Sequence, residues 1–204
     1  SMPMMKGWVP RHVQPWLYVL TALCFQFSGG IYLGALDGIR GTTNFMIEDI
    51  LFLLYATLAG MAVYFPILFR MKFRFTNKQL LCGSAIVLAI CNVLTMHCQS
   101  MHVLMIVCFI AGMAKIQGTF ECMSNIQLWI TPRRDFAVFF PVLHIILLTA
   151  IEGSGWLAAW FGHHFTWQMM HVFTIGTMSF VLLTQAIFCR PFCPMPQRLS
   201  LKGI

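Results

Sequence analysis

Long apolar runs separated by short polar and basic stretches dominate the chain. These runs predict six membrane-spanning helices at residues 16–36, 50–69, 80–96, 103–130, 136–161 and 171–189. Apolar runs of this length are typical of helices, because the strands of a membrane barrel would show alternating segments of about ten residues. The expected fold is therefore all-α, a polytopic bundle of six transmembrane helices.

The spans divide the chain into three parts. Residues 1–15 form a short N-terminal segment, residues 16–189 the transmembrane domain, and residues 190–204 a Pro-rich, basic tail. This tail has the character of a cytoplasmic linker, at a place where a longer chain would continue.

The basic residues predict the orientation of the spans. With the N-terminus inside the cell, eleven of the thirteen Lys and Arg residues fall on the cytoplasmic side: Lys6, Arg11, Arg70, Lys72, Arg74, Lys78, Arg133, Arg134, Arg190, Arg198 and Lys202. Arg40 falls on the opposite side and Lys115 inside the membrane. We therefore expect a multi-pass protein of the cell inner (plasma) membrane with both termini in the cytoplasm.

Composition supports this assignment and excludes several classes of protein. Hydrophobic residues make up 59% of the chain, charged residues 9%, and the mean hydropathy is +0.78. Soluble domains contain about 25% charged residues. Six spans leave no room for a separate aqueous catalytic domain, so an enzyme is not expected. The net charge of +7 lies in loops, which argues against nucleic acid as a partner.

Cysteines and histidines give no basis for a cofactor or a metal site. The eight cysteines contain no CxxC pair, and most lie in apolar runs. Five histidines fall near the predicted outer ends of the spans, but their spacing matches no recognised ligand motif: His97, His102, His163, His164 and His171. Neither a cofactor nor a metal is therefore expected.

The fourth span carries polar residues that hydrocarbon does not tolerate alone. Lys115, Gln117, Glu121 and Asn125 lie within its apolar sequence. At about 100° per residue, Gln117, Glu121 and Asn125 share one stripe, whereas Lys115 lies about 120° from Glu121. Lys115 and Glu121 therefore each need water or a partner on another helix. The stripe is either a structural polar network or the lining of a functional cavity, and the number of polar groups favours the cavity.

Two further carboxylates are candidates for a transport pathway. Glu152 lies in the fifth span beside the small residues 153–155, where desolvation makes it a candidate for proton exchange near neutral pH. Its alternative role is a neutral carboxyl group that is permanently hydrogen-bonded between helices. Asp37 lies near the outer end of the first span, where it either pairs with Arg40 at the interface or belongs to an outer gate.

Small residues at four-residue spacing predict close contacts between helices. Gly30 and Gly34 have this spacing in the first span, and Ala56 and Gly60 have it in the second. Such residues let two helix backbones approach each other, so we expect both pairs to lie in helix–helix contacts.

The pattern as a whole resembles the N-terminal half of a major facilitator superfamily (MFS) transporter. The shared features are six spans, an inside N-terminus, a basic loop after the second span and a polar fourth span. The stretches "WVPRHVQPW", "YLGALDGIRG" and "EDILFLLYATLAGMAVYFP" are similar to a Bacteroidetes-type branch related to the fourteen-helix drug:proton antiporters, over residues 7–190. This resemblance implies that spans one and four line a central cavity and that spans two and five face a second half.

One family signature departs from its usual form. The pattern G-x-L-x-D-R-x-G-R-[KR] would fall on "FRMKFRFTNK", where Phe69, Phe73 and Thr76 replace the first Gly, the Asp and the second Gly. Arg74 and Lys78 keep the basic character. The resemblance therefore implies transport more strongly than drug export.

The sequence predicts a secondary active transporter, or the N-terminal half of one, that moves a small solute by alternating access. Proton-coupled efflux is one form of this activity. In this interpretation Lys115 is a counter-charge, Glu121 and Glu152 are candidate proton carriers, and Gln117 and Asn125 supply hydrogen bonds. The partners would be membrane lipid, a small-molecule substrate, protons, and a second six-helix half from the same chain, a separate chain or a second copy.

Two other functions remain open from the sequence. A non-transporting membrane assembly or regulatory protein would use the polar residues only for stability. A haem-binding membrane redox protein would need facing histidine pairs at matched depths, but only His144 lies deep in a span.

Overall fold

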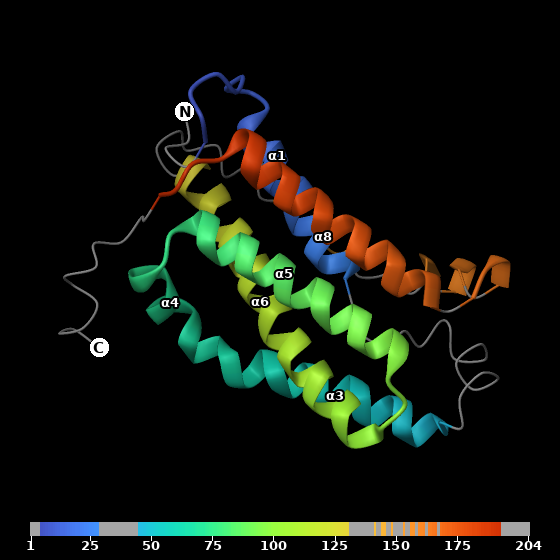
Figure 1. Ribbon diagram of the computed structural model, residues 1–204. Helices are drawn as coiled ribbons and strands as arrows, with labels where there is room; N and C mark the ends of the chain where they lie inside the picture. The colour runs from blue at the N-terminus through green and yellow to red at the C-terminus, as the bar shows by residue number, and fades with distance from the viewer. Residues whose placement is uncertain are drawn as a thin grey trace.

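The computed structural model describes residues 5–28, 45–130 and 168–192, together with scattered positions between 141 and 166. The helices are α1 (Gln14–Phe27), α3 (Ile47–Tyr64), α4 (Leu68–Arg74), α5 (Asn77–His97), α6 (Met101–Ile130) and α8 (Gln168–Phe188), and a 3₁₀ turn, η2 (Phe65–Ile67), joins α3 to α4 (Figure 1). The described residues contain no strand, only one isolated β-bridge. The predicted all-α fold class is confirmed.

Four helical stretches of the described residues are long and apolar enough to cross a membrane: Ile47–Arg74, Asn77–His97, Met101–Gln127 and Gln168–Phe188. They correspond to the second, third, fourth and sixth predicted spans, with boundaries shifted by a few residues. The first predicted span coincides in part with α1, and much of the fifth lies outside the described residues. The count of six spans therefore stays a prediction.

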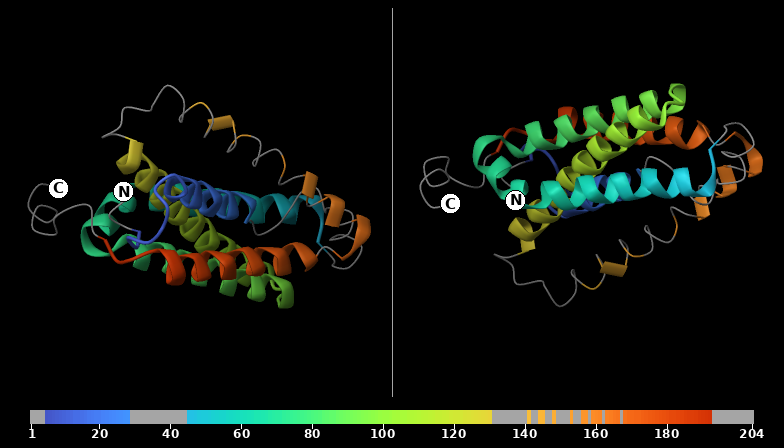
Figure 2. Two further views of the ribbon diagram at one scale, coloured as in Figure 1. Left: turned by 90° about the horizontal axis from the view of Figure 1, so that it is seen from above. Right: turned by 90° about the horizontal axis from the view of Figure 1, so that it is seen from below.

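The bundle is organised around α6, which crosses it obliquely. This helix packs against α1, α3 and α5, while α8 packs against α5 and α1 (Figures 1 and 2). The largest apolar cluster joins α1, α5, α6 and α8 and includes Phe25, Leu81, Ile126 and Val181. Many large apolar side chains point outward instead, as expected for helices surrounded by lipid.

Glycines allow α3 and α6 to approach closely. A Cβ atom at Gly60 would overlap the carbonyl group of Phe109, and one at Gly112 would overlap the carbonyl group of Thr57. The backbones of the two helices are therefore in direct contact at both glycines. The prediction that Gly60 is a helix-contact residue is confirmed, whereas Gly30 and Gly34 lie outside the described residues.

Several chain segments meet at one end of the bundle. There the backbone N–H of Lys6 donates to the carbonyl oxygen of Phe188 at 2.9 Å, and the N–H of Asn77 donates to that of Phe192 at 2.8 Å. These bonds bring together the N-terminal segment, the start of α5 and the end of α8, and α4 leads into the same region. We call this region the basic end, because all described Lys and Arg residues except Lys115 lie there: Lys6, Arg11, Arg70, Lys72, Arg74, Lys78 and Arg190.

Candidate functional site

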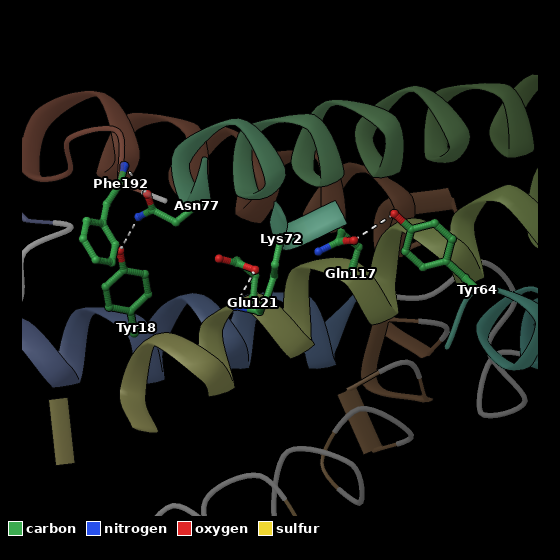
Figure 3. Close-up of polar contacts among 7 residues, drawn as sticks. All are labelled: Tyr18, Tyr64, Lys72, Asn77, Gln117, Glu121 and Phe192. Carbon is green, nitrogen blue, oxygen red and sulfur yellow. Dashed lines mark hydrogen bonds and ion pairs between the residues drawn. The ribbon is translucent and has the colours of Figure 1, made fainter. Parts of the chain in front are cut away.

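A buried ion pair joins α4 to α6. The ammonium nitrogen of Lys72 lies 3.1 Å from Oε2 of Glu121, and their side chains are 3% and 0% exposed (Figure 3). The structure thus supplies the partner on another helix that the sequence required for Glu121. The prediction that Lys72 lies in a loop is wrong, because the residue is helical and its side chain is buried, whereas its position on the cytoplasmic side stays a prediction.

The helical geometry after α3 brings Lys72 to this position. Pro66 interrupts α3, but it occupies an early position of η2, where the missing N–H is tolerated, and the chain continues into α4. Leu68 and Lys72 lie one turn apart and are both buried, whereas Arg70 and Arg74 are exposed. The four-residue spacing of Leu68 and Lys72 was a signal in the sequence that could have identified this buried face.

The surroundings of the ion pair are aromatic. The ammonium of Lys72 lies 5.6 Å from the centre of the Phe120 ring, and the ring of Phe69 packs edge-on against Phe120 at 5.4 Å. Oε1 of Glu121 accepts no hydrogen bond from the residues that the structure describes. The carboxylate therefore has its counter-charge but not its full set of hydrogen bonds.

One turn away on α6, Gln117 contacts α3. The hydroxyl of Tyr64 donates to Oε1 of Gln117 at 2.8 Å, and both side chains are buried (Figure 3). Within the described part of the chain, Nε2 of Gln117 has no acceptor. The bond to Tyr64 fixes the orientation of the amide and leaves its donor group available.

Two further buried amides are incompletely bonded. The side chains of Asn125 on α6 and Gln185 on α8 are fully buried, and neither the oxygen nor the nitrogen of either amide has a partner among the described residues. An unsatisfied amide in an apolar interior costs about 1–3 kcal/mol or more. Gln185 is not among the site residues predicted from the sequence, because it is isolated in the apolar run of the last span.

Three predicted site residues do not join this group. Lys115 is half-buried, whereas Glu121 contacts Lys72 and Gln117 contacts Tyr64. Asp37 and Glu152 lie outside the described residues, so their proposed roles stay predictions. The polar stripe that can be described therefore consists of Gln117, Glu121 and Asn125, with Lys72 as an unexpected member.

A second polar cluster closes the basic end. Nδ2 of Asn77 donates to the hydroxyl of Tyr18 at 3.2 Å, that hydroxyl lies 3.8 Å from Sγ of Cys189, and the N–H of Phe192 donates to Oδ1 of Asn77 at 2.7 Å (Figure 3). These contacts bind the start of α5 to α1 and to the segment after α8. No buried polar side-chain atom of this cluster lacks a hydrogen-bond partner among the described residues. The cluster therefore has the character of a structural junction.

The described histidines do not gather into a metal site. Nδ1 of His171 lies 2.8 Å from Oδ1 of Asn92, and both side chains are buried between α5 and α8. No group of three or more His, Cys, Asp or Glu residues in the described part of the chain is arranged to hold a metal ion.

Along α6, from Gln117 to Asn125, the structure therefore presents an amide donor, a paired carboxylate and a second amide. Such a row can bind a polar or charged solute, or transfer a proton, once the helices open. No protein-family model matches the chain, and no curated protein or solved structure matches it.

Proposed function

We propose that the chain is a secondary active transporter, or the N-terminal half of one, that moves a small solute across the cell inner membrane by alternating access. The observation that carries this proposal is the row of buried, incompletely bonded groups on α6: Nε2 of Gln117, Oε1 of Glu121 and both polar atoms of Asn125. Each is 4% exposed or less.

The energetic argument concerns the groups that lack partners. A bundle needed only for assembly gains nothing from buried polar atoms without hydrogen bonds, and each costs several kcal/mol where water is absent. A carrier uses such atoms in another conformation, in which water or a solute reaches them. The buried ion pair then belongs to a closed state, and opening would separate α4 from α6.

The proposed roles follow from this geometry. Glu121 is the proposed proton carrier, because a proton can neutralise its carboxylate when Lys72 moves away. Gln117 and Asn125 are the proposed hydrogen-bonding groups for the solute. Lys115, Glu152 and Asp37 keep the pathway roles that the sequence predicts for them. The basic end is proposed to face the cytoplasm, in keeping with the positive-inside rule.

The resemblance to half of an MFS transporter that the sequence predicts gives this proposal a specific form. A second six-helix half, from a continuation of the chain, a separate polypeptide or a second copy, would complete the cavity. Proton-coupled efflux remains the proposed form of transport.

A solute screen on the product of the full reading frame tests the proposal. The protein is reconstituted in vesicles with an entrapped pH-sensitive dye, and anionic and amphipathic solutes are added one class at a time. We expect at least one class to drive proton movement in the wild type and in Glu48→Gln, an exposed carboxylate at the start of α3, but not in Glu121→Gln. Equal proton movement in all three proteins, or none in any, would contradict the proposal.

A static assembly or regulatory role is the second candidate. The complete burial of the Lys72–Glu121 pair favours it, because a permanently closed ion pair serves to join two helices. In that case Glu121→Gln would lower stability, and no solute would move protons in the wild type.

A further inference from the structure

An apolar groove opens on the side of the bundle between α3–α4 and α5, with α6 as its floor. Its volume is about 320 Å³. The walls and floor are lined by apolar side chains that include Met71 of α4, Phe75 directly after α4, Val87 of α5, and Ile110 and Met113 of α6. In a membrane this surface faces hydrocarbon, so water is not its natural occupant.

The groove is elongated along α5. It runs along α5 from Gln79 to Val87, and eight residues of helix span about 12 Å. An acyl chain can occupy such an open apolar groove without leaving any polar group unpaired. An extended peptide would leave its backbone unpaired in hydrocarbon.

Two polar residues, Gln117 and Tyr64, also line the groove. Gln117 lines the groove and is 4% exposed, and its Nε2 has no acceptor among the described residues. Tyr64, which also lines the groove, holds the other end of the amide through its hydroxyl. Nε2 is a fully buried atom, so the surface that the groove presents is almost entirely apolar, which matches an acyl chain.

The charges beside the groove select the headgroup. Arg70 and Arg74 are exposed on α4, next to the groove-lining Met71 and Phe75, and Lys78 adjoins the groove-lining Gln79 at the start of α5. The described part of the basic end contains one acidic side chain, Glu121, which is buried against Lys72. An anionic headgroup at the membrane surface is attracted to such a cluster, with about 1 kcal/mol for each basic residue.

We propose that the groove binds an anionic glycerophospholipid, with one acyl chain between α4 and α5 and the phosphate group beside Arg70 and Arg74. This site is distinct from the Glu121 ion pair and does not depend on transport. It stands even if the chain is an assembly or regulatory protein.

Two glycines provide a matched test. Gly83 lines the groove, and a Cβ atom added there meets no atom within 4 Å, so a side chain can start from this position without a clash. Gly176 on α8 is also exposed and has the same free space, but it lies outside the groove. Gly83→Leu fills the groove, and Gly176→Leu adds the same side chain elsewhere.

The experiment uses the full chain in vesicles of phosphatidylcholine that contain a small fraction of phosphatidylglycerol with a photoreactive acyl chain. After irradiation, labelled peptides are located by mass spectrometry. We expect labels on the groove-lining segments of α5 and α6. Because a leucine excludes about two methylene groups from the groove, Gly83→Leu should lower this labelling about tenfold, whereas Gly176→Leu should leave it unchanged.

Three outcomes would overturn the proposal. The first is equal labelling by photoreactive phosphatidylcholine, which would remove the headgroup preference. The second is labelling that Gly83→Leu does not change in a protein of normal helix content. The third is crosslinking of the groove to a second copy of the chain, which would identify a protein as its occupant.

Discussion

The ammonium of Lys72 lies 3.1 Å from the carboxylate of Glu121, and both groups are buried inside the bundle. The two residues are far apart in the sequence and belong to different helices, α4 and α6. Two opposite charges removed from water stabilise each other only while both are present. The pair therefore stabilises the packing of α4 against α6. Breaking the pair should lower the stability of the protein.

Removing one partner of this pair should destabilise the protein strongly. We expect Lys72→Met to lower the free energy of unfolding in detergent by about 3–5 kcal/mol, because Glu121 is left buried without a counter-charge. The double variant Lys72→Met/Glu121→Met should recover most of this loss, since it buries no charge. Equal unfolding free energies for Lys72→Met and the wild type would show that the pair is not formed.

The hydrogen bond from Tyr64 to Gln117 should contribute a smaller, separate amount. Tyr64→Phe leaves a buried acceptor without a donor, so we expect a loss of about 1–3 kcal/mol in the free energy of unfolding. Tyr55→Phe is the matched control, because Tyr55 lies on the same helix and is 57% exposed. Its effect should stay within about 0.5 kcal/mol. Similar losses in the two variants would argue against the contact.

The contact between α3 and α6 should not tolerate even one added methyl group at its glycines. In Gly60→Ala the new Cβ atom would overlap the carbonyl group of Phe109, so the helices must separate, at a cost of about 1–3 kcal/mol. Gly176→Ala adds the same methyl group in open space and should be neutral or slightly stabilising. Thermal unfolding of both variants in one detergent makes the comparison. A neutral Gly60→Ala would contradict the close approach.

The junction at the basic end should protect Cys189. Asn77→Ala removes the side-chain bonds to Tyr18 and Phe192, so the segment after α8 should open more often and expose the thiol, which is 1% exposed. If the closed state loses about 1.4 kcal/mol of stabilisation relative to the open state, the open population rises about tenfold, and the alkylation rate rises with it. Asn92→Ala, a second buried asparagine on α5, should leave the rate at Cys189 unchanged. Peptide-resolved mass spectrometry distinguishes this thiol from the others.

The positions of the described helices were largely predictable, because apolar runs of membrane length leave the chain few alternatives. Some boundaries required local chemistry that the hydropathy pattern does not contain. Helix α5 begins at Asn77 rather than at residue 80, since the Thr76 hydroxyl accepts from the N–H of Gln79 at 3.2 Å and Oε1 of Gln79 accepts from the N–H of Thr76 at 3.0 Å. This capping box is visible in the sequence "TNKQ".

The candidate site was predictable only in part. The spacing of Gln117, Glu121 and Asn125 placed them on one stripe of α6, and all three are buried in the structure. Lys72 was misplaced because a basic residue after an apolar run is usually a loop residue, and only the packing of α4 on α6 shows otherwise. Gln185 was not predicted, because it is a single amide in an apolar run and no other polar residue lies at helical spacing to mark it as part of a stripe.

The central claim is that water reaches the buried stripe of α6 in some state of the protein. Asn125→Cys tests it in sealed vesicles with a charged, membrane-impermeant thiol reagent, and native Cys122, buried in the apolar cluster of the same helix, is the internal control. We predict that the cysteine at position 125 reacts from one side of the membrane, while Cys122 stays unmodified. If both thiols stay equally unreactive from both sides in a folded protein, the stripe is permanently dry and the transport account is contradicted.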